Sequence, residues 1–296
     1  MTVLNKIRRN VNLRLPMKLF FSAIFFILLV QISFASNWPS EIKLGLIPIE
    51  GGSNEKERFT PLAEYLEKKL KIKVKLFSAS DYAGIITALE HDHIDLAYLG
   101  AKTYIEAYTK TGAKIVVMEL NEKGFSGYKG VIITGKNSGI KSIKDIKGKT
   151  FAFIDPNSTS GYLIQAAYFK SLNPPIEPRS YFKELKFAGS HVAAILSVKN
   201  LLVDLAATNE IDIERMIESG QIAKGDVRTL WTSELVPQGA IVARKGLPPD
   251  LVQAIQKALL KVPSQVKAKL QDGGFKLGKD SDYDYVRYLI KIKEQL

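Results

Sequence analysis

The stretch Asp155-Pro156-Asn157-Ser158-Thr159-Ser160-Gly161 is the segment on which the expected fold and function depend. It follows a strand-like run at 150–154 and precedes a helix-like run at 162–169, so three consecutive hydroxyl side chains fall where a helix begins. The first N–H groups of a helix lack partners inside it, and the aligned peptide dipoles leave partial positive charge there. Three O–H donors and a glycine that allows close backbone approach therefore suit a small oxyanion such as phosphate. The alternative is that Ser158 or Thr159 only caps the helix, but a cap needs one hydroxyl and not three.

Composition indicates a globular protein and excludes several classes of site. The chain has 296 residues, a length sufficient for two lobes. Of these residues, 46% are hydrophobic and 24% charged, which is ordinary for a globular protein. It contains no cysteine, so disulfides, thiolate metal sites, a catalytic thiol and a lipid on an N-terminal cysteine are excluded. The formal net charge is +12, but five basic residues lie in the first 35 residues, and without them 37 basic residues face 30 acidic ones. The remaining charge of +7 favours capture of an anion, whereas no element carries the basic and aromatic pattern of a nucleic-acid site.

The N-terminus, residues 1–35, is typical of an export signal. Lys18 precedes an apolar run at 19–30, and Ser33-Phe34-Ala35 matches a small-x-small cleavage site. The true start could be Met17, because residues 1–16 resemble an extension. The alternative is an uncleaved anchor, for which the apolar run is marginally short. The signal predicts a periplasmic mature protein, tethered if the signal is retained.

Strand-like and helix-like runs alternate along the chain, which predicts an α/β fold with mostly parallel sheets. Strands are expected at 42–48, 74–77, 94–100, 150–154 and 202–207, and helices at 59–70, 81–89, 102–108, 142–148, 162–172, 192–199 and 249–262. The runs 128–134 and 239–244 are expected to cross between two lobes. Lobe 1 would hold residues 36–131 and 238–296, and lobe 2 would hold 132–237. Ligands of such folds bind at the carboxyl ends of the strands, in the cleft between the lobes.

Four motifs carry a resemblance to a known family. They are Asp81-Tyr82-Ala83-Gly84-Ile85-Ile86, Asp95-Leu96-Ala97-Tyr98-Leu99-Gly100, the hydroxyl stretch 155–161, and Gly189-Ser190-His191. In this order and spacing they resemble the phosphonate-, phosphite- and phosphate-binding (PhnD-like) periplasmic components of ABC importers, over about residues 42–260. The resemblance implies a type II periplasmic-binding-protein fold, in which two α/β lobes joined by two hinge strands close on the ligand.

The resemblance also implies a binding site without metal, cofactor, lysine or arginine. Its expected ligand-binding residues are Tyr82, Tyr98, Ser158, Thr159, Ser160, His191 and Asn209. The hydroxyls and the phenol of Tyr82 are donors, and an oxyanion offers only acceptors. Two alternatives stay open: Tyr82 as a half-buried core aromatic, and His191 as a helix cap or surface residue.

Two departures from the family narrow the expected ligand. Members that bind aminoalkyl phosphonates place acidic side chains near the ammonium group, but here Ile211 stands where that acid is expected, with Glu210 beside it. The segment 237–240 contains no aspartate either. An ammonium buried without a carboxylate is strongly disfavoured. The sequence therefore predicts phosphite, phosphate or a small alkylphosphonate, and Glu210 reaching the cleft would weaken this prediction.

Other function classes fit the sequence less well. No nucleophile is paired with a base, and no HExxH or Ser-x-Gly elbow is present, so the protein is not expected to be an enzyme. A sensor-type binding protein of the same fold, for another small anion or an organic solute, is the remaining alternative. The expected partners are the ligand and a membrane permease, and the protein is expected to be a monomer.

Overall fold

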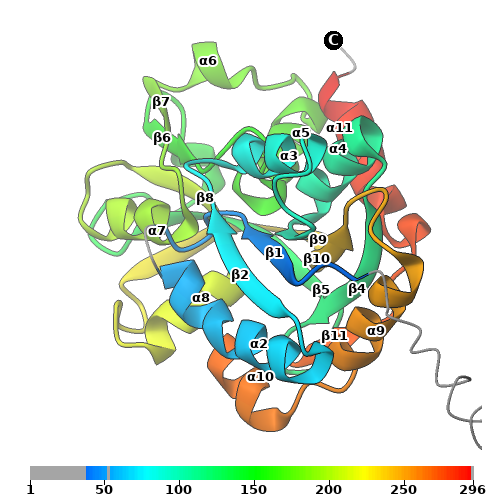
Figure 1. The fold of residues 1–296 in the computed structure, drawn as a ribbon. Coiled ribbons are helices and arrows are strands. Elements are labelled where there is room, and N and C mark those ends of the chain that lie inside the picture. Colours follow the sequence, from blue (N-terminus) through cyan, green and yellow to red (C-terminus); the bar gives the residue numbers. More distant parts are fainter. Residues whose placement is uncertain (1–37, 52–53, 295–296) are drawn as a thin grey trace, which may run out of the picture. The chain divides into compact units, whose positions relative to one another are not determined.

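Two β-sheets organise the computed structural model, which describes residues 38–51 and 54–294 (Figure 1). The export signal expected at residues 1–35 lies outside the described residues. One sheet has six strands in the order β11-β4-β10-β3-β1-β2, and the other has five in the order β7-β6-β8-β5-β9. The strands of the six-stranded sheet are β1 (Glu41–Leu46), β2 (Lys73–Ser78), β3 (Leu96–Leu99), β4 (Lys114–Leu120), β10 (Ala240–Ala243) and β11 (Gly274–Lys276). Those of the five-stranded sheet are β5 (Gly127–Gly135), β6 (Thr150–Phe153), β7 (Glu184–Phe187), β8 (Leu205–Asn209) and β9 (Val227–Pro237).

Helices connect most of these strands, as the alternating sequence pattern predicted. Those that accompany the six-stranded sheet along the chain are α2 (Asn54–Leu70), α3 (Tyr82–Glu90), α4 (Ala101–Thr111), α9 (Pro249–Leu259) and α10 (Ser264–Leu270). Those that accompany the five-stranded sheet are η1 (Ile143–Asp145), η2 (Thr159–Leu163), α5 (Ile164–Ser171), α6 (Pro178–Tyr181), α7 (His191–Lys199) and α8 (Glu210–Glu218). The chain then ends its described part with η3 (Asp280–Tyr283) and α11 (Asp284–Glu294). The helix expected at 142–148 is only the short turn η1.

The sheets are mixed, and not mostly parallel as the sequence suggested. β1 pairs in parallel with β2 and β3, and β6 pairs in parallel with β7 and β8. However, β10 runs antiparallel between β3 and β4, and β5 runs antiparallel between β8 and β9. The difference arises because a strand that returns from the other sheet enters in the opposite direction. The sequence reading also missed β4, β9, β11, α8 and α11.

The chain passes between the two sheets at two adjacent places. One is the link from β4 to β5, and the other is the two-residue link from β9 to β10. The two links lie side by side, because Gly127 pairs with Pro237 and the Gln238 N–H donates to the Ser126 carbonyl over 3.0 Å. The runs expected to cross, 128–134 and 239–244, instead lie within single sheets, and the crossings precede them. Two short adjacent links are what a hinge between lobes requires.

Helix α11 does not belong to one sheet alone. It packs against α4, which follows a strand of the six-stranded sheet, and against α5 and η2, which follow a strand of the five-stranded sheet. The Lys293 ammonium also lies 5.7 Å from the centre of the Tyr162 ring. Helix α11 therefore contacts elements of both predicted lobes. The assignment of residues 238–296 to the first lobe stays a prediction.

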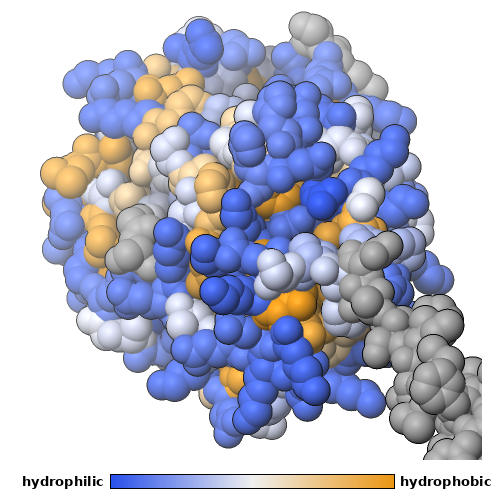
Figure 2. Space-filling view, viewed as in Figure 1, coloured by the Kyte–Doolittle hydropathy of each residue, from blue (hydrophilic) through white to orange (hydrophobic). Residues whose placement is uncertain are grey.

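Apolar side chains fill the space around each sheet. A cluster beside the five-stranded sheet includes Phe151, Phe153, Phe169 and Phe182, each at most 5% exposed. Most of the face in Figure 2 is hydrophilic, with apolar residues in small groups. Within the described part of the chain, no helix has the length and apolar character needed to cross a membrane. Phe151 and Phe153 of this cluster lie on β6, which is the strand that leads into the hydroxyl stretch.

Candidate functional site

A cavity of about 60 Å³ lies between the two sheets. All seven side chains singled out from the sequence line it: Tyr82, Tyr98, Ser158, Thr159, Ser160, His191 and Asn209. The remaining lining residues are Ile47, Ile49, Gly100, Glu119, Tyr128, Ile211, Asp212, Arg215, Gln238 and Gly239. The fold thus gathers motifs that are up to 127 positions apart in the sequence, from Tyr82 to Asn209, around one small space.

The hydroxyl stretch forms a helix start, as the sequence predicted. Ser158 is the N-cap, and its Oγ accepts the Gly161 N–H over 3.0 Å. The helix begins with the wide turn η2 and continues as α5. Gly161 is required here, because a Cβ at this position would lie 2.5 Å from Ile154. The capping interpretation is therefore correct for Ser158, but it accounts for only one of the three hydroxyls.

Each of the three hydroxyl oxygens accepts one N–H group. Besides the Gly161 bond to Ser158, the Lys102 backbone N–H donates to Thr159 Oγ1 over 2.9 Å. The Asn209 side-chain amide donates to Ser160 Oγ over 3.3 Å. A hydroxyl has one hydrogen and two lone pairs, so an oxygen that accepts from N–H keeps its hydrogen to donate. Each hydroxyl therefore keeps one hydrogen, which it can donate to a neighbouring phenol, Tyr82 for Ser158 and Tyr128 for Thr159 and Ser160, or to a ligand in the cavity.

Two phenols add donors beside these hydroxyls. Burial raises the pKa of Tyr82 well above its ordinary value, and burial also raises the pKa of Tyr128 to about 12. Both phenols thus keep their protons at physiological pH. Tyr128 was missed in the sequence, where it was assigned to a connecting strand; its position as a buried aromatic near the start of β5 was the available signal. Tyr98 differs, because its phenol already donates to Glu119 Oε2 over 2.6 Å.

His191 is a buried residue at the first position of α7, and Ser190 caps that helix. Its backbone N–H donates to the Ile49 carbonyl over 2.9 Å, and its Nδ1 lies 2.9 Å from Thr208 Oγ1. Burial lowers the pKa of His191 even though Asp212 lies 3.3 Å away and opposes the shift. The imidazole is therefore neutral near pH 7. The surface interpretation of His191 is wrong, because only 4% of the residue is exposed.

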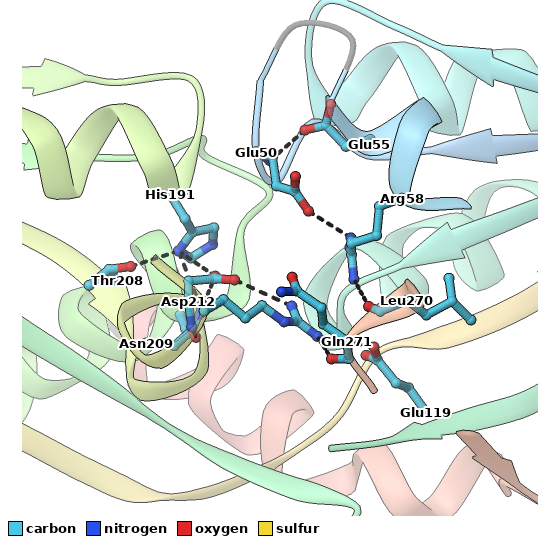
Figure 3. A network of polar contacts seen from close by, with 12 residues as sticks. Glu50, Glu55, Arg58, Glu119, His191, Thr208, Asn209, Asp212, Leu270 and Gln271 are labelled. Carbon is cyan, nitrogen blue, oxygen red and sulfur yellow. Dashed lines mark hydrogen bonds and ion pairs between the residues drawn. The ribbon is translucent and has the colours of Figure 1, made fainter. Parts of the chain in front are cut away.

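Three charged side chains that the sequence reading did not expect line the cavity: Glu119, Asp212 and Arg215. Figure 3 shows the polar network around Asp212 and Glu119. Arg215 lies 3.5 Å from Asp212 and 3.8 Å from Glu119, and it donates to the Gln271 carbonyl over 2.9 Å. The expectation of a site free of lysine and arginine is therefore wrong. The cause is helix α8, which begins at Glu210 with Asn209 as its N-cap, so that Asp212 and Arg215 lie in its first two turns beside the cavity. Neither α8 nor β4, which carries Glu119, was predicted.

The sequence predicted no carboxylate at the binding site, and the structure places two carboxylates there. Ile211 does line the cavity, whereas Glu210 lines a neighbouring groove and accepts from the Lys129 N–H over 3.3 Å. The acids at the cavity are Asp212 and Glu119. Asp212 also accepts the Asn209 amide over 2.6 Å, so both carboxylates already have partners in the protein.

A buried acid lies close behind this charged group. Burial and the nearby Glu119 carboxylate raise the pKa of Asp272 to about 7, against the opposing effect of its hydrogen bond from the Gly274 N–H. Over the described ranges, no group of three or more histidine or acidic side chains is placed to hold a metal ion. The chemistry available in the cavity is therefore hydrogen-bond donation from neutral groups, next to one arginine that is balanced by two carboxylates.

Comparisons with known proteins agree with this geometry. Residues 44–283 match the family model described as "ABC transporter, phosphonate, periplasmic substrate-binding protein". The phosphonates-binding periplasmic protein of Escherichia coli is 31% identical over 294 residues, which cover 96% of this chain and 86% of that protein. A binding-protein component of an ABC phosphonate transporter from Pseudomonas aeruginosa has a solved structure with a TM-score of 0.81 and 30% identity, covering 86% of this chain and 87% of that one. The structure of Prochlorococcus marinus PhnD1 in complex with methylphosphonate has a TM-score of 0.78 and 21% identity, and covers 87% and 100% of the two chains.

Proposed function

This chain belongs to the family of periplasmic substrate-binding proteins of phosphonate ABC transporters, and from that premise we propose that it captures a small phosphorus oxyanion. The ligand would be phosphate, phosphite or a small alkylphosphonate. The two lobes would close on it at the hinge links, and the loaded form would deliver it to a membrane permease.

The observation that carries this proposal is the state of the three consecutive hydroxyls. Ser158, Thr159 and Ser160 each accept an N–H and so keep a hydrogen to donate. The phenols of Tyr82 and Tyr128 line the same cavity and stay protonated. An ionised oxyanion is an acceptor on every oxygen, and hydrogen bonds to charged groups are about twice as strong as neutral ones.

The size of the cavity supports a small ligand. A volume of about 60 Å³ holds about four to six water-sized spheres at 10–15 Å³ each, which suits an ion of about five heavy atoms. An aminoalkyl substituent would also need a free carboxylate, and both Asp212 and Glu119 are engaged with other groups. The preference for ligands without an ammonium group therefore rests on occupied carboxylates and not on their absence.

The remaining parts of the proposal concern the form of the protein. We infer export by a signal at residues 1–35, a mature protein that acts as a monomer, and lobes that divide at the link from β4 to β5, a few residues before the expected boundary at 131, and near residue 237. The family's periplasmic character supports export. The adjacent links from β4 to β5 and from β9 to β10 support the positions of the lobe boundaries.

A thermal-shift panel tests the function directly. Phosphate, phosphite, hypophosphite, methylphosphonate and aminoethylphosphonate are each added to the purified protein. A ligand at about 100 times its dissociation constant adds about 2.7 kcal/mol of stability, which is a measurable rise in Tm. At least one of the first four should produce it, and aminoethylphosphonate should produce less.

A double substitution tests the site within the same assay. Ser158→Ala with Thr159→Ala should abolish the ligand-induced shift. It should lower the ligand-free Tm by only a few degrees, because loss of an N-cap costs about 1 kcal/mol. Ser171→Ala is the matched control, because Ser171 ends the same helix at an exposed position and donates to Tyr168. A double variant that keeps the full shift would show that the hydroxyls do not hold the ligand.

A further inference from the structure

The small cavity has a much larger neighbour. A groove of about 750 Å³ lies along the hinge links, and Ile211 and Arg215 line both spaces. At four further points, neighbouring residues of the chain line the two spaces, one the groove and the other the cavity: Met118 and Glu119, Gly127 and Tyr128, Glu210 and Asn209, and Pro237 and Gln238. The wall between the two spaces is therefore about one side chain thick.

Arg215 is the longest side chain of this wall, and it is held in place from both sides. It lies on α8, and through Asp212 it is tied to the same helix. Its guanidinium also donates to the Gln271 carbonyl over 2.9 Å and lies 3.8 Å from Glu119, both of which belong to segments around the six-stranded sheet. Its side chain is 15% exposed. Ile211 lies one helical turn before it, on the same face.

We propose that Arg215, together with Ile211, sets the upper size limit of the ligand by closing the cavity against the groove. The inference rests on the proposed function and deepens it. With Arg215 in place, the space of about 60 Å³ admits a phosphorus oxyanion with no substituent or with a single carbon. Without its bulk, the cavity joins the groove of about 750 Å³, and a longer alkyl substituent extends into it while the oxyanion stays on the hydroxyls.

Affinity across a chain-length series tests the proposal. Methyl-, ethyl-, propyl- and butylphosphonate are titrated by calorimetry into the unsubstituted protein and into Arg215→Ala. In the unsubstituted protein we expect the dissociation constant to rise about tenfold or more from methyl to propyl, since one methylene in a closed pocket is worth about tenfold or more. In Arg215→Ala the same ratio should fall to about threefold or less.

Two further variants separate bulk from charge. Arg215→Met removes the charge but keeps a long side chain, so its methyl-to-propyl ratio should stay near that of the unsubstituted protein. Ile211→Ala opens the wall without removing any ion pair, so the methyl-to-propyl ratio of this variant should fall toward that of Arg215→Ala. It also serves as the test if Arg215→Ala does not fold.

Several outcomes would overturn the inference. One is equal affinity of the unsubstituted protein for methyl- and propylphosphonate. Another is an Arg215→Ala variant that weakens all four ligands by the same factor, or an Arg215→Met variant that matches Arg215→Ala, because either result assigns the effect to charge. If the unsubstituted protein binds neither phosphate, phosphite nor any of the series, the proposed function fails and this inference fails with it.

Discussion

The two sides of the cavity use opposite kinds of chemistry. The side formed by η2 presents neutral donors, namely the hydroxyls of Ser158, Thr159 and Ser160. The side formed by α8 and β4 presents full charges, Asp212, Arg215 and Glu119, which largely balance one another. A balanced charge group has little net attraction for an anion, whereas hydroxyl and phenol hydrogens do attract it. Under the two proposals made above, recognition and confinement of the ligand are therefore assigned to different elements of the fold.

The largest expected effect comes from disrupting the neutral side at its backbone. Gly161→Ala places a Cβ 2.5 Å from Ile154 and 2.7 Å from Ser158 Oγ, so the helix start must shift. Overpacking of this kind costs about 1–3 kcal/mol, and the displaced hydroxyls should also lose the ligand-induced thermal shift. Gly100→Ala is the matched comparison, because its Cβ would lie 3.4 Å from Thr159 Oγ1, which is close to ordinary contact. If urea unfolding shows the same loss in free energy of unfolding for both variants, the close contacts at position 161 have no special importance.

Two tyrosine substitutions, each of which removes a single hydrogen-bond donor, compare the two sides of the cavity directly. Tyr82→Phe should weaken phosphate or phosphite binding about tenfold or more in calorimetry, because a hydrogen bond to a charged group is worth about 1.5–3 kcal/mol. Tyr98→Phe should change it by less than about threefold, because the Tyr98 phenol already donates its one hydrogen to Glu119. The reverse order of effects would place Tyr98 on the recognition side.

A separate expected effect, on stability and not on ligand binding, is a dependence of the free energy of unfolding on pH that comes from the charged side. Burial and the Glu119 carboxylate raise the pKa of Asp272 from 3.8 to about 7. Between these values the folded protein binds a proton that the unfolded chain has released, so the free energy of unfolding contributed by Asp272 falls as pH rises. The slope is at most about 1.4 kcal/mol per pH unit.

Asp272→Asn should remove this slope while keeping the acceptor for the Gly274 N–H. The measurement is the difference between the two proteins in urea unfolding from pH 4.5 to pH 8. That difference cancels the opposite contribution of His191, whose lowered pKa makes the folded state lose stability as pH falls. A difference that does not vary with pH would show that Asp272 is ionised throughout.

The sequence predicted the neutral side of the cavity well and the charged side poorly. The hydroxyl stretch is a local pattern, and its strand, turn and helix follow from neighbouring residues, so the helix start at Ser158 was correct. Arg215 and Glu119 are 96 positions apart in the sequence, and nothing local to either indicates the other. Their contact depends on α8 and β4, neither of which was predicted from the sequence. Buried charges of this kind become visible only when the partner that balances them is known.

Several hydrogen bonds join residues of the six-stranded-sheet side to residues of the five-stranded-sheet side without involving a ligand. The Lys102 N–H reaches Thr159, the Thr103 hydroxyl reaches the Asn157 carbonyl over 3.0 Å, and the His191 N–H reaches the Ile49 carbonyl. These bonds join protein groups only, so they stabilise the closed form whether or not a ligand is bound. If the protein works as proposed, the permease would distinguish the ligand-bound protein from the ligand-free one by the fraction of each that is closed, and hydrogen bonds from the hydroxyl stretch to the ligand would raise that fraction.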